Sequence, residues 1–362
     1  MYQSFAQEDM IENKVRKLQR RWERNQRKQN KVNTLQIIPA VSYTPETSLG
    51  VGAVGMYKFK LDRSDSAMAY SNISPIALYT FNRQLILSAR YQVLSVENYV
   101  FRGEIGYWLF PYFFWGIGNN PPSNRKEEYS ASFPRFFLSA YRKWKPNLYA
   151  GIKYEFQNTN ITKTDPDGQL SGGKVPGSGG SIQSGIGLGA NYDSRDHVLS
   201  AHEGWFVDVG FVGMGSATGS SYTDVKWTID ARKYFKVNAQ YVLAFQGIYE
   251  GHTGTPPFNL TAQLGGNEIM RGYQRGVYRD NNLMAIQGEY RSPVFYKYFA
   301  AAVFGSIGGV GQDFGDITRH LKWTTGGGLR FSTRPQDRFF LRVDVGFGPD
   351  TFGFYFALGE AF

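Results

Sequence analysis

Apolar and polar positions alternate with a period of two along most of the chain from residue 34 to residue 362. In the stretch 85–93 the odd-numbered positions are all apolar, whereas the even-numbered positions are largely polar. Because successive side chains of a strand point to opposite faces, this pattern predicts strands with one apolar and one polar face. Turn residues divide the region into sixteen strands, at about 34–43, 49–61, 68–81, 84–95, 98–109, 128–143, 147–157, 182–193, 203–214, 222–235, 240–251, 282–292, 297–309, 322–333, 337–347 and 351–361.

These strands have the lengths expected of strands that cross a bilayer, which need about 9–11 residues in the hydrocarbon region. The chain contains no run of eighteen apolar residues, and a closed barrel is the other structure that leaves no unpaired backbone in lipid. The pattern therefore predicts an all-β protein, a 16-stranded antiparallel transmembrane β-barrel. A soluble sandwich is the alternative, but it would leave sixteen strands with few buried faces.

Connection lengths predict an orientation. Short connections near 95–98, 145–147, 238–240 and 335–337 alternate with long ones near 110–127, 158–181, 252–281 and 310–321. Outer-membrane barrels keep short turns in the periplasm, so we expect both termini to be periplasmic in the outer membrane of a Gram-negative bacterium. The aromatic cluster at 108–115 either marks the outer rim or packs against a loop. We expect 158–181, which is rich in Gly and Ser, to be an exposed flexible loop.

The first 33 residues differ from the rest. Nine Lys and Arg residues and one Glu lie between Lys14 and Lys31, which is a large part of the formal net charge of +10. Apolar residues recur on one face of a helix at Ile11, Val15, Leu18 and Trp22. We therefore divide the chain into a basic arm, 1–33, which we predict to be a periplasmic helix, and a barrel, 34–362. A solvated tether is the alternative for the arm.

Motifs for catalysis are missing. The Gly177–Ser181 stretch lacks the spacing of a serine nucleophile elbow, and Gly185–Gly189 lies within a strand pattern with no helix after it. The four histidines show no metal-ligand spacing, and Cys is absent. We therefore expect no enzyme activity, no cofactor and no metal. The expected partners are outer-membrane lipids and other outer-membrane or periplasmic chains, and no nucleic acid.

The longest connection, about 252–281, carries the most distinctive residues. A loop of this length in a compact domain is generally functional or disordered. It contains Met270, Arg271, Gly272 and Tyr273 among further aromatic and basic residues, so it is able both to pack and to pair charges. A mobile surface loop is the alternative interpretation.

These four residues resemble the V/I-R-G-F/Y motif in the sixth loop of the BamA/TamA superfamily, the bacterial surface antigen barrels. Other stretches match in the order of that family: Tyr43–Thr47, Trp115–Asn119, Asp193–Asp196, Glu289–Arg291 and Tyr355–Phe362. The resemblance covers 34–362 and implies sixteen strands. It also marks Tyr355 and Phe362 as a barrel-assembly signal. Because the family's periplasmic POTRA domains have no counterpart in these residues, the chain resembles a member without them.

The resemblance further implies that the sixth loop folds into the lumen, where its Arg is held by the inner wall. Family members usually supply an Asp from an F-x-D-x-G pattern on the thirteenth strand, but Ser306 stands at that position here. Glu289, which alternation points toward the lumen, is the candidate substitute, because an Arg in a partly desolvated lumen needs a partner. The candidate loop partners are therefore Glu289 and Ser306.

The function implied is assistance in outer-membrane protein assembly or translocation, together with partner chains. A non-catalytic scaffold barrel within an outer-membrane complex is one alternative. A passive pore is another, since sixteen strands leave an aqueous lumen unless it is filled. The sequence identifies neither the client nor the partner chains.

Overall fold

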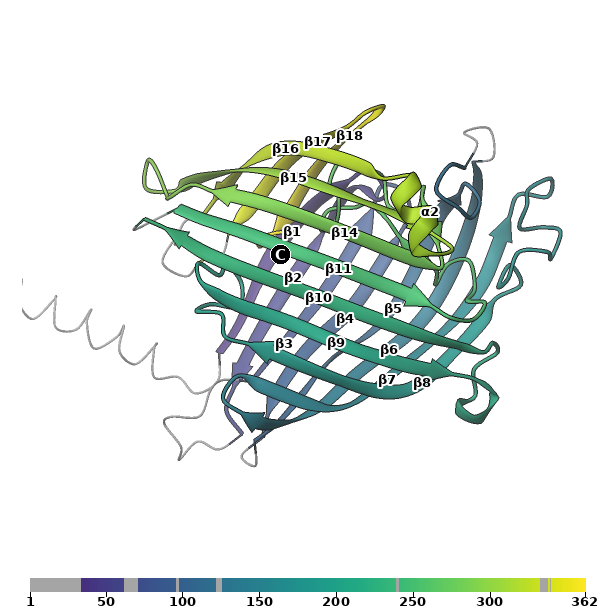
Figure 1. The fold of residues 1–362 in the computed structure, drawn as a ribbon, viewed down its shortest axis with the longest axis horizontal. Coiled ribbons are helices and arrows are strands. Elements are labelled where there is room, and N and C mark those ends of the chain that lie inside the picture. Colours follow the sequence, from purple (N-terminus) through teal and green to yellow (C-terminus); the bar gives the residue numbers. More distant parts are fainter. Residues whose placement is uncertain are drawn as a thin grey trace, which may run out of the picture.

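The protein is a closed antiparallel barrel in the computed structural model, which describes residues 34–61, 71–95, 98–121, 126–238, 241–332, 338 and 340–362 (Figure 1). The wall strands are β1 (Thr34–Thr44), β2 (Ser48–Phe59), β3 (Ser71–Thr80), β4 (Leu85–Leu94), β5 (Tyr99–Phe114), β6 (Glu127–Lys145), β7 (Leu148–Thr164), β8 (Ser181–Asp193), β9 (Gly204–Met214), β10 (Asp224–Val237), β11 (Tyr241–His252), β14 (Asn282–Arg291), β15 (Phe299–Gly311), β16 (Lys322–Phe331), β17 (Leu341–Gly348) and β18 (Thr351–Leu358). The predicted sixteen-stranded antiparallel barrel is confirmed. The basic arm, 1–33, lies outside the described residues.

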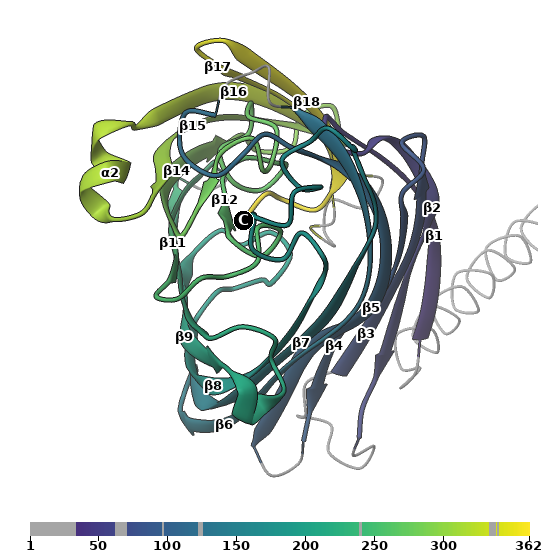
Figure 2. The same ribbon diagram turned by 90° about the vertical axis from the view of Figure 1, so that its right-hand side faces the viewer.

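Four small elements lie between wall strands. They are the 3-10 turn η2 (Ser216–Thr218), the two-residue strands β12 (Ala262–Gln263) and β13 (Arg279–Asp280), and the helix α2 (Phe314–Arg319). The strands β12 and β13 pair with each other inside the ring of wall strands, whereas α2 lies outside it (Figure 2). Within the described ranges, no helix is long and apolar enough to span a membrane.

The alternation of the sequence corresponds to the two faces of the wall. Large apolar side chains such as Leu87, Trp205 and Phe211 are exposed on the outside, as a surface in contact with lipid requires. The polar side chains Arg342 and Asp344, at alternate positions of β17, are buried in the lumen. Burial of charge is tolerated there because the charges pair with one another, as described below.

The first strand, β1, is paired much more extensively with β2 than with β18, the strand with which it closes the ring. β1 pairs with β2 at eleven positions, from Thr34 with Lys58 to Thr44 with Ser48. By contrast, β1 and β18 are paired at a single position, Tyr43 with Phe356. The rest of the edge of β1 that faces β18 therefore contributes few ladder hydrogen bonds. We call this weakly paired contact between β1 and β18 the seam.

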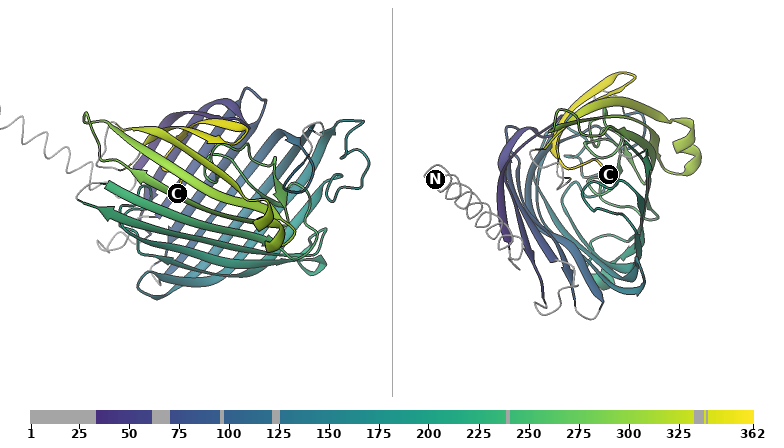
Figure 3. Two further views of the ribbon diagram at one scale, coloured as in Figure 1. Left: turned by 45° about the horizontal axis from the view of Figure 1, so that its top comes forward. Right: turned by 90° about the vertical axis from the view of Figure 1, so that its left-hand side faces the viewer.

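The wall is taller than expected at β5 and β7. The alternation predicts that these strands end near 109 and 157, but β5 continues to Phe114 and β7 continues to Thr164. Both extensions pair with the first residues of β6, for example Phe114 with Glu127 and Thr164 with Tyr129. They form the high side of the barrel at the end with the long loops, which we call the long-loop end; the opposite end is the short-turn end (Figures 1 and 3).

One prediction at the long-loop end needs correction, and one of two alternatives there is decided. The expected flexible loop 158–181 is shorter, because β7 and β8 take up both of its ends, and it is partly buried. Leu170 packs in an apolar cluster with Phe258, and the Phe258 N–H donates to the Pro176 carbonyl at 2.8 Å. The aromatic residues of 108–115 contribute Tyr112, Phe114 and Trp115 to this same cluster. Apolar contact with residues 252–281 therefore orders both segments.

The predicted alternation of connection lengths holds only in part. Turns such as 145–148 and 237–241 lie at the short-turn end, and 114–127, 164–181 and 252–282 lie at the long-loop end. Near the seam, however, the connections 44–48, 80–85 and 348–351 are short although they fall at the long-loop end. The β8–β9 connection, 193–204, is in turn long although it lies at the short-turn end, so connection length alone does not assign the end of the barrel.

Candidate functional site

Residues 253–281, which we call the lumenal loop, run from the end of β11 into the barrel and return to β14 (Figure 2). Backbone hydrogen bonds within it, such as Leu264 N–H to the Tyr278 carbonyl at 3.0 Å, make it compact. Gly265 and Gly266 both have positive φ, at 101° and 106°, a region that side chains rarely adopt. Met270, at the tip, is fully buried against β14 and β15. The alternative of a mobile surface loop does not describe this packing.

Arg271 lies at the tip of the lumenal loop and joins two strands of the wall. Its Nη2 is 2.5 Å from Glu289 Oε2 on β14, and its Nη1 is 2.5 Å from Asp344 Oδ2 on β17. The guanidinium also lies over the ring of Phe304 on β15, with Cζ 3.5 Å from the ring centroid. A planar guanidinium suits this site because it can donate in two directions while one face stacks on an aromatic ring.

Arg330, on β16, links the same two carboxylates from the wall. Its Nη1 is 2.5 Å from Asp344 Oδ1, and its Nη2 is 3.2 Å from Glu289 Oε1. Its Nε donates to Glu360 Oε2 at 2.9 Å, which brings in the residues that follow β18. Each carboxylate therefore has more than one cationic partner, as a buried charge requires.

Two further arginines complete the cluster. Arg342 Nη1 is 3.1 Å from Asp344 Oδ2, and Arg342 Nη2 donates to the Asn267 carbonyl of the lumenal loop at 3.1 Å. Arg291 Nε is 2.8 Å from Glu289 Oε1, and its Nη2 donates to the Phe362 carbonyl at 2.9 Å. We call the seven charged side chains the arginine network: Arg271, Arg291, Arg330, Arg342, Glu289, Asp344 and Glu360.

Glycines of β16 and β17 make the space that the network occupies. A Cβ at Gly328 would lie 2.0 Å from Asp344 Oδ1, and one at Gly326 would lie 2.5 Å from the Phe304 ring. A Cβ at Gly346 would lie 2.3 Å from the Arg271 carbonyl oxygen. The glycines in these strands therefore mark close approach of the lumenal loop and its partners to the wall.

The backbone of the loop tip is held by β18. The Gly272 N–H donates to the Tyr355 hydroxyl at 2.9 Å, and this hydroxyl donates to the Tyr273 carbonyl at 3.3 Å. Thr351 Oγ1 donates to the Gly272 carbonyl at 2.9 Å. The lumenal loop is thus fastened to the two strands that precede the seam, to β17 through Asp344 and to β18 through Tyr355.

Tyr355→Phe is expected to loosen the loop tip without unfolding the barrel. Loss of the hydroxyl leaves the Gly272 N–H buried without its acceptor, which costs about 1–3 kcal/mol. Amide hydrogen exchange at Gly272 and Tyr273 should therefore accelerate by roughly tenfold or more. Tyr79→Phe, which removes a hydroxyl from an exposed position on β3, is the control. Equal exchange in both variants would refute the role given to Tyr355.

The predicted site residues do not all converge. Met270, Arg271, Gly272 and Tyr273 lie together at the loop tip, and Glu289 is in contact with Arg271. Ser306 does not contact Arg271, because its hydroxyl forms a hydrogen bond with Thr324 Oγ1 on β16. The carboxylate that an Asp at this position would supply comes instead from Asp344, two strands away, since β16 lies between β15 and β17.

Two residues that the resemblance marks as an assembly signal face the lumen. Tyr355 is fully buried against the loop tip, and Phe362 is buried in a cluster with Ala201, Tyr234 and Ala244. Gly359 has a φ of 80°, and this turn carries the last residues inward after β18 ends. Figures 2 and 3 show the C-terminus inside the ring of strands. Neither aromatic ring lies on the lipid-facing surface in this conformation.

The base of the lumenal loop has a second set of anchors. The Arg275 N–H donates to Glu46 Oε1 in the β1–β2 turn at 2.6 Å, and the Tyr112 hydroxyl donates to the Arg275 carbonyl. Arg279 is completely buried and donates to the carbonyls of Gly276 and Phe258, at 2.9 and 3.2 Å. Burial lowers the pKa of Arg279. The loop is therefore held at its base as well as at its tip.

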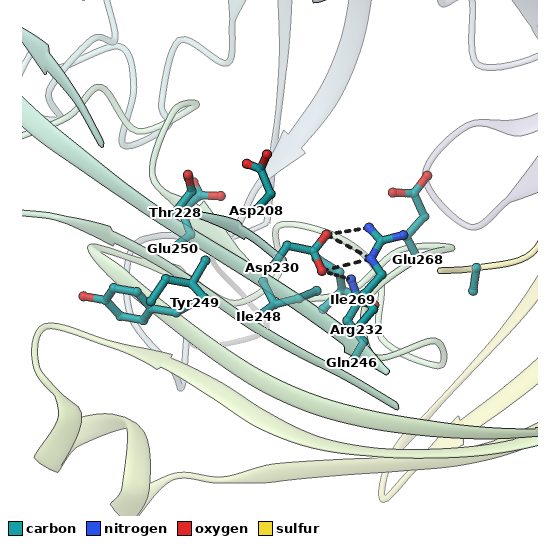
Figure 4. A pocket seen from close by; sticks show the side chains of 12 residues that line it. Asp208, Thr228, Asp230, Arg232, Gln246, Ile248, Tyr249, Glu250, Glu268 and Ile269 are labelled. Atoms are coloured by element: carbon teal, nitrogen blue, oxygen red, sulfur yellow. Dashed lines mark hydrogen bonds and ion pairs between the residues drawn. The ribbon is translucent and has the colours of Figure 1, made fainter. Parts of the chain in front are cut away.

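An acidic cavity of about 200 Å³ lies in the lumen beside the loop (Figure 4). Its walls carry Asp208, Asp230, Glu250 and Glu268 with one arginine, Arg232. Asp230 is paired with Arg232 at 2.5 Å and accepts a hydrogen bond from Gln246 at 2.8 Å. The lumen is thus divided electrostatically: this side is acidic, whereas the side toward β16 and β17 is rich in arginine.

Sequence reasoning missed Asp344 as a partner of Arg271, and it missed Arg330 and Glu360 as the residues that complete the network around that pair. The alternation does point Asp344 and Arg342 toward the lumen, so that signal was present. It does not show which lumenal residues lie at the same height in strands far apart in the sequence. Strand register supplies that information, for example Arg330 opposite Arg342 across β16 and β17.

These features define an outer-membrane β-barrel whose lumen is occupied by its own charged loop. The profile of the Omp85 superfamily domain matches residues 79–362, and the chain belongs to this superfamily of bacterial outer-membrane barrels, as the resemblance to BamA and TamA predicted. No curated protein sequence matches the chain.

Solved structures share the fold. BamA from Haemophilus ducreyi, in a form lacking POTRA domains 1-3, has a TM-score of 0.61 and 12% identity, over 90% of this chain and 70% of that one. CdiB from Acinetobacter baumannii has a TM-score of 0.56 and 13% identity, over 91% and 65%. CdiB from Escherichia coli has a TM-score of 0.57 and 9% identity, over 90% and 67%. At these identities the likeness concerns the fold.

Proposed function

We propose that this barrel inserts or translocates other proteins at the outer membrane, and that the seam is its working opening. The observation that carries the proposal is where the lumenal loop is fastened. Its tip is bound to β17 and β18, which lead to the seam, and its base is bound to Glu46 in the turn after β1. The loop therefore contacts both sides of the one weakly paired junction in the wall.

The seam has the properties that such an opening needs. A strand edge with few ladder partners is a template for pairing with another strand. Leu35 and Ile37 on β1 have 63% and 68% of their surface exposed, so this edge also presents apolar side chains. Separation of β1 from β18 would break one paired position, whereas separation of β17 from β18 would break eight.

The filled lumen argues against a passive pore. The lumenal loop packs in an apolar cluster with Phe114, Trp115 and Leu170 at the long-loop end. The arginine network occupies the lumen below this cluster. Conduction would require displacement of a loop held by at least two buried ion pairs. A scaffold function remains the alternative, and the following experiment distinguishes it.

A disulfide across the seam is expected to stop insertion of client proteins. Tyr43 and Phe356 face each other in antiparallel register, a spacing that a disulfide can bridge, and the chain has no cysteine of its own. The doubly substituted protein, Tyr43→Cys with Phe356→Cys, is reconstituted in liposomes with an unfolded eight-stranded outer-membrane barrel as the client. Acquisition of heat resistance by the client measures insertion, which oxidation should abolish and reduction restore.

The matched control places the disulfide one strand away. Val345→Cys with Phe354→Cys joins β17 to β18, which are paired along their length and need not separate. Oxidation of this control should leave insertion unchanged. Equal insertion by the oxidised and reduced seam variant would overturn the proposed opening. If the unsubstituted protein also failed to accelerate insertion, secretion of an unfolded polypeptide into liposomes would test translocation, and failure there would favour the scaffold.

A further inference from the structure

The arginine network contains four guanidinium groups but three carboxylates. Among the described residues, three of its buried N–H groups have no hydrogen-bond partner: Nε of Arg271, Nε of Arg342 and Nη1 of Arg291. A buried donor without an acceptor is costly, and for a charged group the cost is larger. These side chains therefore carry one more positive than negative charge, and the question is where an additional anion would fit.

A cavity of about 440 Å³ lies at the short-turn end, on the side of the network that faces away from the lumenal loop. Arg291 is 95% buried, and its side chain lines this cavity. Arg330 and Arg338 line it from the end of β16 and from the turn between β16 and β17. Of the described residues that line the cavity, Glu360 is the one with a carboxylate. Three arginines from separate elements therefore share one cavity with a single anionic side chain.

The connection between β8 and β9 closes the cavity from the other side. Ser200 and His202 of this connection line the cavity. Asp196 fixes the connection, because it accepts hydrogen bonds from the His202 N–H at 2.8 Å and from Arg338 Nη1 at 2.5 Å. The Asp193–Asp196 stretch, which resembles the family pattern, therefore has a structural role here. It holds His202 and Arg338 in position around the cavity.

Among the described residues that line the cavity, arginines outnumber carboxylates by three to one. The pKa of His202 is lowered by burial and then by the charges of Arg338, Arg291 and Lys236, while Asp196 opposes this effect. An anion placed in the cavity would reverse this influence and raise the pKa of His202.

We propose that this cavity is a binding site for a phosphate group, held by Arg291 and Arg338 with support from Arg330. Guanidinium groups recognise phosphate through paired, charge-assisted hydrogen bonds, and three of them line this cavity. The volume exceeds that of a bare ion, so the site accommodates a phosphate ester as well as free phosphate. The headgroup of a phospholipid and a soluble phosphate share this chemistry, and the experiment separates them.

The test uses the full chain, labelled in its histidine side chains, in a detergent without phosphate. Inorganic phosphate is titrated to millimolar concentration, and NMR follows the histidine pKa values, with His202→Gln for assignment. We expect the pKa of His202 to rise as phosphate is added. Arg291→Gln and Arg338→Gln should each weaken binding by roughly tenfold or more.

Arg142→Gln is the matched control, because Arg142 is an exposed arginine near the short-turn end that does not line the cavity. A second titration uses a short-chain phosphatidic acid. Binding of both probes supports a site for the phosphate group itself, binding of the lipid alone supports a headgroup site, and binding of phosphate alone supports a soluble ligand. No response of His202 to either probe, or an equal loss in Arg142→Gln, overturns the proposal. If Arg291→Gln does not fold, Arg338→Gln alone decides.

Discussion

Arg271→Ala is expected to release the lumenal loop while the barrel stays folded. Alanine removes the two ion pairs with Glu289 and Asp344, and the loss of one partner from a buried pair costs about 3–5 kcal/mol. Three arginines then remain for three carboxylates, so the wall keeps its charges paired. The lost stabilisation is therefore that of the loop, and the fraction of molecules in which the loop is released should rise at least about a hundredfold.

Limited proteolysis under native conditions, with cleavage sites mapped between Gly265 and Tyr278, measures this release. The folded barrel is monitored in the same samples by its resistance to heat in detergent. Arg275→Ala is the matched control, since Arg275 belongs to the same loop but is exposed and contacts its neighbours through its backbone. Protection of the loop that is unchanged in Arg271→Ala would show that the ion pairs do not hold it.

Gly346→Ala is expected to separate the loop from β17 with no change of charge. The added Cβ would lie 2.3 Å from the Arg271 carbonyl oxygen and 2.9 Å from the Gly272 nitrogen. Because both atoms belong to the backbone, no side-chain rotation relieves the contact, and overpacking of this kind costs about 1–3 kcal/mol or more. We expect the loop to become sensitive to protease, as in Arg271→Ala, although all seven charges of the network are still present.

Gly247→Ala is the control for this change. Gly247 lies within β11, and a Cβ there would meet no atom within 4 Å. Both variants replace glycine by alanine in a strand, so both undergo the same change in strand propensity. Any difference in protease sensitivity between them therefore comes from the contact with the loop. A similar pattern of proteolysis in the two variants would contradict the close approach of Gly346 to the loop tip.

The barrel could be predicted from the sequence because alternation is local. Within each strand, the alternation of apolar and polar residues shows which side chains face lipid and which face the lumen. The sixteen strands and the inward direction of Asp344 therefore follow from this two-residue period. The approach of Glu289 to Arg271 required in addition the resemblance to a family in which the loop enters the lumen.

The partners of the loop at β16 and β17 could not be predicted in the same way. Arg271 and Asp344 are 73 residues apart, and their contact depends on the tilt and register of the four strands from β14 to β17. The family's Asp is replaced by Ser306 in this chain, and the carboxylate comes from a different strand. Nothing in the sequence around Ser306 indicates which strand supplies it. The ordered segment near Leu170 has the same origin, since its glycine-rich sequence suggests mobility and its order comes from contact with Phe258.

The arginine network also constrains the biogenesis of this protein. Its members come from the lumenal loop, from β14, β16 and β17, and from the residues after β18, so no counter-charge for Arg271 on β17 exists in a nascent chain that ends before Asp344. A guanidinium without a partner is poorly tolerated inside a barrel within a bilayer. Glu289 on β14 is available earlier, but the complete set of partners for Arg271 exists only once β17 has joined the wall, so the loop tip is fully fastened late in assembly.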